Sequence, residues 1–273
     1  MNLEAKAIDI RKDIIDLIYK AGCGHIGGDL SVTDILVDLY YKQMNVSPEN
    51  INDPDRDRFV LSKGHSVEAL YCVLADKGFF DKKELFDTYS GYLSKYIGHP
   101  NNKINGVEMN TGSLGHGLGV AVGMALAGKM DNRSYRVYAV LGDGEMAEGS
   151  NWEAITAGAH YNLDNLTAFV DRNRLQISGT TEEVMTADSQ ENRWAAFGWN
   201  VLSIPGNDIT AIDSAVSLAK GTAGKPTVII ANTTKGCGVS FIENKAAWHH
   251  KVPNEAEYQQ AMKELSERRA QYE

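Results

Sequence analysis

The stretch Arg136–Ala154, RVYAVLGDGEMAEGSNWEA, decides the fold because it joins an apolar strand, a polar turn and the start of a helix. The run RVYAVL is typical of a parallel strand that is buried on both faces. A second apolar run, LTAFV at 166–170, ends at Asp171-Arg172-Asn173, and a helical pattern at 152–160 lies between the two runs. This order of strand, helix and strand predicts a parallel sheet.

Similar patterns continue on both sides of this unit. Met1–Lys20 carries apolar residues at helical spacing among charged ones, which predicts an amphipathic helix. Ser31 followed by Asp34 predicts a capping box for a helix that runs through Tyr40. We therefore expect one doubly wound α/β domain over residues 1–273, with a mostly parallel sheet and helices on both faces. Further strands are expected at 58–62, 199–204 and 226–231, further helices up to 75, at 120–130, near 193, at 209–219 and at 254–272, and irregular structure at 80–110.

Composition excludes several classes of protein. The chain has 273 residues, 43% of them hydrophobic and 23% charged, which is ordinary for a folded domain. Its net charge of -9 argues against a nucleic-acid partner, because phosphate neutralisation needs clustered lysine and arginine. No apolar segment has the length of a membrane span, and the N-terminus lacks the apolar core of a signal peptide. The three cysteines form no C-x-x-C pair, so we expect a reduced, cytoplasmic protein.

The ends of the two clearest strands carry metal-competent side chains. In a parallel sheet, ligands bind at the carboxyl ends of the strands, where Asp143 and Asn173 stand. Their hard oxygen atoms suit Mg²⁺. Gly142 and Gly144 let the backbone approach a diphosphate closely, and a helix beginning near Gly149 would direct its N-terminus at that anion. A lone GDG is usually a turn, so only the pairing of the two strand ends makes the pattern specific.

The spacing of Gly142-Asp143-Gly144 and Asn173 resembles the signature of thiamine-diphosphate enzymes. The segments RDRFVLSKGH, GHP, TGSLGHGLG, GDGEMAEGSNWEA and DRNRLQISG resemble transketolase motifs in the order of that family, and the likeness covers nearly the whole chain. Two positions depart from the family pattern. Arg172 stands where asparagine or aspartate is common, and His116 stands where glutamine is common. Neither is an expected metal ligand.

The resemblance implies a role for each matching residue. Asp143, Asn173 and the backbone carbonyl of Leu175 would hold Mg²⁺. His65, Gly142 and Gly144 would contact the diphosphate of thiamine diphosphate. Gly112 and Leu114 would contact the aminopyrimidine, and Ile177 would lie near the thiazolium. His249 would also contact the cofactor. Glu148 resembles the glutamate that links the two cofactor sites of the dimer.

Histidines form the expected catalytic set. His25, His65 and His99 each lie next to glycine, in a turn or at a strand end. Histidine both donates and accepts protons near neutrality, as ketol transfer between sugars requires. With the metal pair, this favours these three as catalytic residues, and the family motif adds His249 rather than its neighbour His250.

The resemblance also implies a partner chain. Full-length transketolases continue into a second domain that supplies the glutamate activating the aminopyrimidine ring. We expect a separate chain to supply it, in an α₂β₂ heterotetramer with two copies of each chain. Loss of that half by cloning is the weaker alternative, since the chain begins with Met and ends in an expected helix. Alone, the chain is expected to hold the cofactor weakly.

The expected activity is transfer of a two-carbon ketol unit from a ketose phosphate to an aldose phosphate. Pentose-phosphate exchange is the default, and a ketose with another anionic end group stays open. Two related enzymes are alternatives, one of the chains of a 2-oxoacid dehydrogenase and a fragment of a deoxyxylulose-phosphate synthase. The histidine motifs argue against the first, and pyruvate as donor would reveal the second. A non-catalytic cofactor-binding chain is the remaining alternative.

Overall fold

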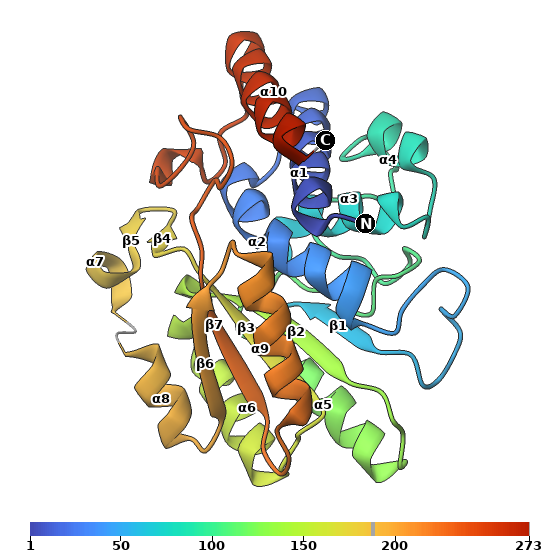
Figure 1. Ribbon diagram of the computed structural model, residues 1–273, viewed down its shortest axis with the longest axis vertical. Coiled ribbons are helices and arrows are strands. Elements are labelled where there is room, and N and C mark those ends of the chain that lie inside the picture. The colour runs from blue at the N-terminus through green and yellow to red at the C-terminus, as the bar shows by residue number, and fades with distance from the viewer. Residues whose placement is uncertain (187–188, 273) are drawn as a thin grey trace.

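The computed structural model describes residues 1–186 and 189–272, and its centre is a parallel five-stranded sheet (Figure 1). The spatial order is β1-β2-β3-β7-β6, and every neighbouring pair is parallel. The predicted α/β fold with a parallel sheet is therefore confirmed. The strands are β1 (Arg58–Leu61), β2 (Val137–Gly142), β3 (Leu166–Arg172), β6 (Asn200–Pro205) and β7 (Thr227–Asn232).

Helices cover both faces of the sheet because alternate strand residues point to opposite sides. One face carries Phe59, Tyr138 and Phe169, which belong to a core shared with α1, α2, α3 and α9. The other carries Val60 and Ala139 and packs on α5, α6 and α8. The helices are α1 (Leu3–Ala21), α2 (Ile26–Asp38), α3 (Val67–Asp76), α5 (Gly117–Met130), α6 (Gly149–His160), α8 (Gln190–Ala196) and α9 (Ile209–Gly221).

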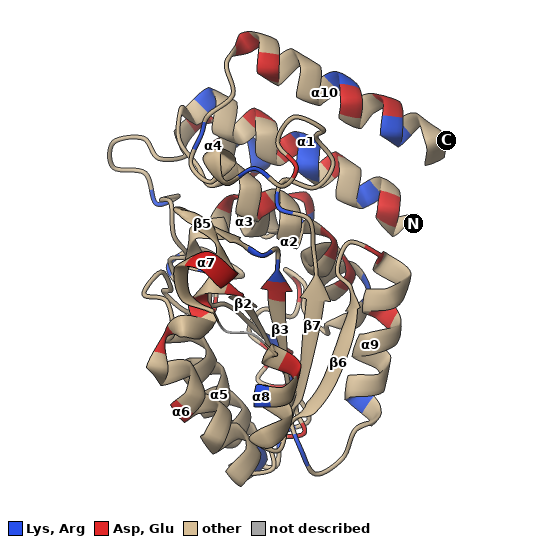
Figure 2. Cartoon of the chain, turned by 90° about the vertical axis from the view of Figure 1, so that its left-hand side faces the viewer, with Lys and Arg blue, Asp and Glu red and all other residues tan. Residues whose placement is uncertain are grey.

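The last long helix, α10 (Glu255–Arg269), packs beside α1 at the end of the molecule where both termini lie (Figure 1). Asn254 caps it in a capping box with Glu257. Acidic and basic residues are frequent along α1 and α10, whereas the central strands carry few (Figure 2). Among the described helices, none combines the length and apolar character that crossing a membrane requires.

Short elements complete the chain around the sheet. Residues 39–43 continue α2 as one π-helical turn. β4 (Leu175–Gln176) and β5 (Gly179–Thr180) form a small hairpin, followed by α7 (Thr181–Met185). Single 3₁₀ turns cover Gly64–Ser66, Gly144–Ala147, Ala246–Trp248 and Ala270–Tyr272.

Two sequence-based expectations were wrong. Ser31 and Asp34 do not cap a helix, because α2 already begins at Ile26 and both residues are buried inside it. The Ser31 hydroxyl donates to the carbonyl of Gly28 and to Asp171, and Asp34 pairs with Arg11. The segment 80–110 is not wholly irregular, since α4 (Lys82–Thr88) forms within it and buries Leu85.

Candidate active site

Four neighbouring strands deliver polar side chains to one edge of the sheet. Lys63 follows β1, Asp143 follows β2, Asn173 follows β3 and Lys235 follows β7. All four side chains line a pocket of about 470 Å³. Because the strands are parallel, their carboxyl ends meet there, as expected from the sequence.

The structure gathers almost all the predicted site residues around this pocket. His99 does not line it, but its ring centroid lies 6.3 Å from that of His25. His250, which the sequence argument set aside, lines the pocket beside His249. The predicted residues that line it are His25, His65, Gly112, Leu114, Gly142, Asp143, Gly144, Glu148, Asn173, Leu175, Ile177 and His249.

Asp143 is the buried carboxylate of the pocket floor, 4% exposed. Its Oδ1 accepts from the backbone N–H of Gly144 at 2.9 Å, and its Oδ2 accepts from that of Arg174 at 2.5 Å. The amide oxygen of Asn173 accepts from the backbone N–H of Leu175 at 3.1 Å. Burial and then the nearby Asp171 raise the pKa of Asp143 to about 6. A bound cation would offset this cost of an ionised carboxylate.

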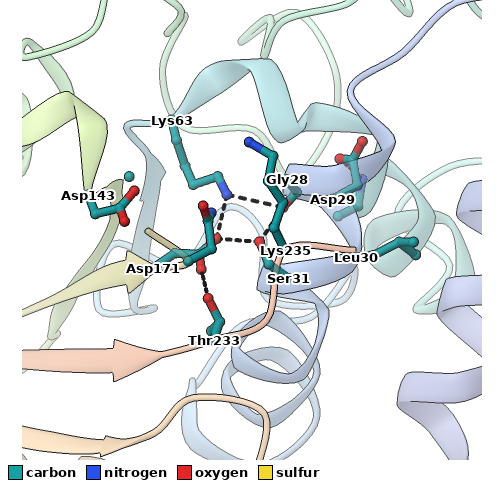
Figure 3. A network of polar contacts seen from close by, with 12 residues as sticks. Gly28, Asp29, Leu30, Ser31, Lys63, Asp143, Asp171, Thr233 and Lys235 are labelled. Carbon is teal, nitrogen blue, oxygen red and sulfur yellow. Dashed lines mark hydrogen bonds and ion pairs between the residues drawn. The ribbon is translucent and has the colours of Figure 1, made fainter. Parts of the chain in front are cut away.

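Lys63 and Asp171 form a fully buried ion pair beneath the pocket (Figure 3). The Lys63 Nζ donates to Asp171 at 2.5 Å and to the Gly28 carbonyl at 3.0 Å. Asp171 also accepts from the hydroxyls of Ser31 and Thr233. This network joins the ends of β1, β3 and β7 to the first turn of α2, so it fixes the backbone on which the site residues stand.

Lys235 is a buried cation of a different kind. It is 2% exposed, and no carboxylate among the described residues lies within ion-pair distance of it. Its Nζ donates to the Leu175 carbonyl at 3.1 Å and to His249 Nδ1 at 2.9 Å. Burial and then the charge of Lys63 lower the pKa of Lys235 to about 8. A buried cation without an anionic partner is costly, so this position favours an anionic ligand.

Histidine rings form one wall of the pocket. The ring centroid of His25 lies 5.3 Å from that of His65, 5.6 Å from that of His249 and 4.0 Å from that of His250. Burial and then the neighbouring His250 lower the pKa of His25 to about 4. Burial and then Lys63 lower the pKa of His65 to about 2, and burial and then Lys235 lower that of His249 to about 3. These rings are therefore neutral near pH 7 and can both accept and donate protons.

Residues 3–271 match the protein family described as the transketolase, thiamine diphosphate binding domain. The chain belongs to the transketolase family. The resemblance identified from the motifs is thereby confirmed, and so is the expectation of a domain that binds thiamine diphosphate.

Its relatives in the transketolase family include single subunits of similar length. The chain is 50% identical to one subunit of the apulose-4-phosphate transketolase of Phocaeicola vulgatus, covering 97% of this chain and 94% of that one. It is 45% identical to the subunit of the same name from Actinobacillus succinogenes, covering 97% and 96%. It is 44% identical to one subunit of the 6-deoxy-6-sulfo-D-fructose transketolase of a Clostridium species, again covering 97% and 96%.

A solved transketolase from Campylobacter jejuni has the same fold, with a TM-score of 0.91 and 32% identity. The match covers 97% of this chain but only 43% of that one, so the chain spans less than half of the solved enzyme. The transketolase family thus includes both long chains and separate subunits of this size.

Several pocket residues of this transketolase-family chain escaped the sequence argument. Lys63 lies in the motif RDRFVLSKGH, but the sequence of this motif does not indicate that the ammonium group of Lys63 is buried. Lys235 follows β7, and the rule that located Asp143 and Asn173 would have found it. Glu145 is 2% exposed and accepts from the Ser62 hydroxyl and from the backbone N–H groups of Gly115 and Gly142. The other unpredicted lining residues are Gly28, Ala147, Gln176, Ser178 and His250.

The residues present fit the diphosphate and metal of the family's cofactor. The donor set contains carboxylate, amide and carbonyl oxygens at one edge of the sheet, which suits a hard divalent cation. Lys235 supplies an unpaired positive charge, and the N-terminus of α6 borders the pocket through Glu148. At Gly144 a Cβ atom would stand 3.3 Å from the side chain of Gln176, which also lines the pocket. A side chain at this position would therefore crowd the pocket wall, and glycine avoids this.

Proposed function

We propose that this chain is the diphosphate-binding subunit of a two-chain transketolase. It would transfer a two-carbon ketol unit from a ketose to an aldose, both with anionic end groups. The observation that supports this most directly is the buried Lys235. It lines the same pocket as Asp143 and Asn173, and it forms no ion pair with a carboxylate among the described residues. A diphosphate bridged to a divalent cation satisfies both the unpaired ammonium group and the buried carboxylate.

The metal proposed is Mg²⁺, held by Asp143, Asn173 and the carbonyl oxygen of Leu175. That carbonyl accepts a hydrogen bond from Lys235, so metal binding would leave the ammonium group free to pair with the diphosphate. Thiamine diphosphate supplies the electron sink for cleavage and formation of the carbon–carbon bond. This chain's own residues bind, orient and move protons.

The histidines would act on the hydroxyl and carbonyl oxygens of the sugar. His249 receives the Lys235 hydrogen bond at Nδ1, so its neutral ring carries the proton on Nε2 and donates from there. His25 and His65 stand beside it as neutral rings that can take a proton from a sugar hydroxyl. His99 does not line the pocket, but its ring lies next to that of His25, and it would contact a part of the substrate that extends beyond the pocket.

The relatives named above point to the class of donor. Their names specify apulose 4-phosphate and 6-deoxy-6-sulfofructose, which are ketoses with a phosphate or sulfonate end group. We propose apulose 4-phosphate as the first donor to test, because the two most similar of these three relatives carry that name. Xylulose 5-phosphate, the donor of pentose-phosphate exchange, is the second.

The proposed partner is a separate chain that supplies the activating glutamate, in an α₂β₂ heterotetramer. Exposed apolar side chains support a docking surface on this side of the molecule. Ile177, which lines the pocket, is 67% exposed, and Met185, on the short helix α7 that contacts β4, is 63% exposed. Glu148 is exposed and lines the same pocket, and in the proposed assembly its carboxylate would link this cofactor site to the second one. We also propose a cytoplasmic location, on the basis of the sequence composition and the three free thiols.

Reconstitution with the candidate partner chain tests this function. Ketol transfer is measured with thiamine diphosphate, Mg²⁺ and each donor for this chain alone, for the pair, and for the pair with Asp143→Ala. We expect turnover only in the unmodified pair. Turnover by the isolated chain would contradict the need for a partner, and an active Asp143→Ala pair would contradict the metal site.

A further inference from the structure

Two acidic side chains are fully buried behind the histidine wall. Asp29 and Glu68 are each 0% exposed. Asp29 lies in the first turn of α2, just after His25, and Glu68 lies in the first turn of α3, just after His65. Neither lines the pocket, so neither contacts a ligand there. Buried acids are rare unless they are paired, so this arrangement needs a reason.

The carboxyl group of Asp29 is bonded to the start of α3, beside Glu68. Asp29 Oδ1 accepts from the backbone N–H of Ala69 in α3 at 3.0 Å. Glu68 accepts from the Tyr89 hydroxyl at 2.6 Å. The bond between Asp29 and Ala69 joins the two helix starts, and the backbone N–H of Asp29 donates to the His25 carbonyl at 3.2 Å, which ties His25 to the same turn.

The two remaining oxygens, Asp29 Oδ2 and Glu68 Oε2, are buried and accept no hydrogen bond from any residue that the structure describes. Asp29 is bonded to Ala69, the residue after Glu68, and each of the two carboxyl groups shifts the pKa of the other. Two ionised carboxylates buried side by side would repel strongly, whereas one proton between them satisfies both oxygens. Burial raises the pKa of Asp29 well above its usual range, and burial raises that of Glu68 to about 7.

The surroundings supply little positive charge to keep both carboxyls ionised. The titratable groups that interact with Asp29 or Glu68 are Lys63, Tyr71, Cys72 and Tyr89. Cys23 lies one step further away and interacts with Tyr89. Lys63 is the cation among them, and it already pairs with Asp171. Burial raises the pKa of Tyr71, Cys72 and Tyr89, so these three groups are neutral near pH 7.

We propose that Asp29 and Glu68 share one proton and act as positioning residues that hold His25 opposite His65. The shared proton joins the first turns of α2 and α3, which carry the two rings. Loss of the proton leaves two repelling carboxylates and separates the helix starts. The catalytic consequence rests on the proposed transketolase function, but the proton-sharing pair does not.

Infrared spectroscopy of the isolated chain tests the pair without any assay of function. At neutral pH the difference spectrum of wild type minus Glu68→Gln should show the carbonyl stretch of one protonated carboxyl group. Asp38 and Asp143, whose pKa values are also raised, contribute equally to both spectra and cancel. The difference spectrum of wild type minus the exposed Glu153→Gln is the control and should lack the band. Absence of the band from the difference spectra of both Glu68→Gln and Asp29→Asn overturns the proposal.

The pH dependence of the reconstituted enzyme tests the positioning role. An amide at position 68 donates to Asp29 without a titrating proton, so Glu68→Gln should retain kcat and extend the alkaline limb of activity by about one pH unit. Glu68→Ala should lower kcat by about tenfold or more with a smaller change in KM. An alkaline limb that Glu68→Gln leaves unchanged contradicts the positioning role. If the reconstituted wild-type enzyme is inactive, that result contradicts only the proposed function. The infrared spectra test the shared proton of Asp29 and Glu68 separately.

Discussion

Lys235 donates a hydrogen bond to the Nδ1 atom of His249 across 2.9 Å. This contact joins the one pocket cation that lacks a carboxylate partner among the described residues to a ring of the histidine wall. The protonation of the His249 ring therefore depends on the lysine charge, because burial and then Lys235 lower the pKa of His249. The same ammonium group faces the proposed diphosphate, so anion binding and the protonation of His249 are linked.

Replacing Lys235 with methionine should therefore weaken cofactor binding and raise the pKa of His249. A charge-assisted hydrogen bond contributes about 1.5–3 kcal/mol, so we expect the affinity for thiamine diphosphate to fall roughly 10- to 100-fold. Calorimetry on the reconstituted pair gives the affinity, and NMR titration of the histidine rings gives the pKa. Lys251→Met removes a lysine that lies over Trp248 and is the matched control. Equal affinity in wild type and Lys235→Met would refute the proposed anion contact.

Gly112 should tolerate no side chain. Its φ angle is 138°, and a Cβ atom there would lie 2.5 Å from the His99 ring. We expect Gly112→Ala to displace His99 and lower kcat/KM by about tenfold or more, through backbone strain and the moved ring. Gly119→Ala is the control, since a Cβ atom there meets nothing within 4 Å and α5 gains a better helix former. Unchanged kinetics in Gly112→Ala would show that His99 is not held by this contact.

Asp38, at the end of α2 and away from the pocket, should make stability depend on pH. It is fully buried, and burial followed by the charge of Asp213 raises its pKa from 3.8 to about 7. The stability that its neutral form contributes is thus present below about pH 4 and is lost as pH rises through about 7. Asp38→Asn should therefore stabilise the chain near pH 8, by at most about 4 kcal/mol, and change little near pH 4.

Urea denaturation of Asp38→Asn and wild type at both pH values measures this difference. Asp87→Asn, on the exposed face of α4, removes a surface ion pair with Lys83 and serves as control. A stability gain for Asp38→Asn that is larger at the acidic pH would reverse the sign and refute the argument.

The sequence predicted the sheet and the metal-binding edge for the same physical reason. Continuous apolar strands such as β2 are buried on both faces, and their carboxyl ends must carry the polar residues, which located Asp143 and Asn173. The α2 capping box failed because Ser31 and Asp34 satisfy a local rule while their partners are distant. Ser31 bonds Asp171, and Asp34 pairs with Arg11. Local spacing contains no information about such contacts.

The same limit explains the site residues that the sequence missed. Lys63 and Lys235 are both long cationic side chains, which are usually exposed, and only the assembled sheet shows that their ammonium groups are buried. The Asp29–Glu68 pair depends on two helices that begin after separate motifs, so neither acid is informative alone. His25, His65 and His99 could be found because glycine neighbours marked their turns, whereas His249 came from the family motif alone.

Ile177 should be part of the partner-binding surface. It lines the pocket, yet 67% of it is exposed, which is unusual for a large apolar side chain beside a binding site. Ile177→Asp would place a charge in the proposed interface and should weaken association with the partner chain by about tenfold or more, while the thermal unfolding of the isolated chain stays unchanged. Leu218→Asp is the matched control, because Leu218 is 62% exposed on α9 and does not line the pocket. Calorimetric titration of each variant with the partner separates the two surfaces. Equal weakening by both variants, or weakening by Leu218→Asp alone, would place the interface elsewhere on the molecule.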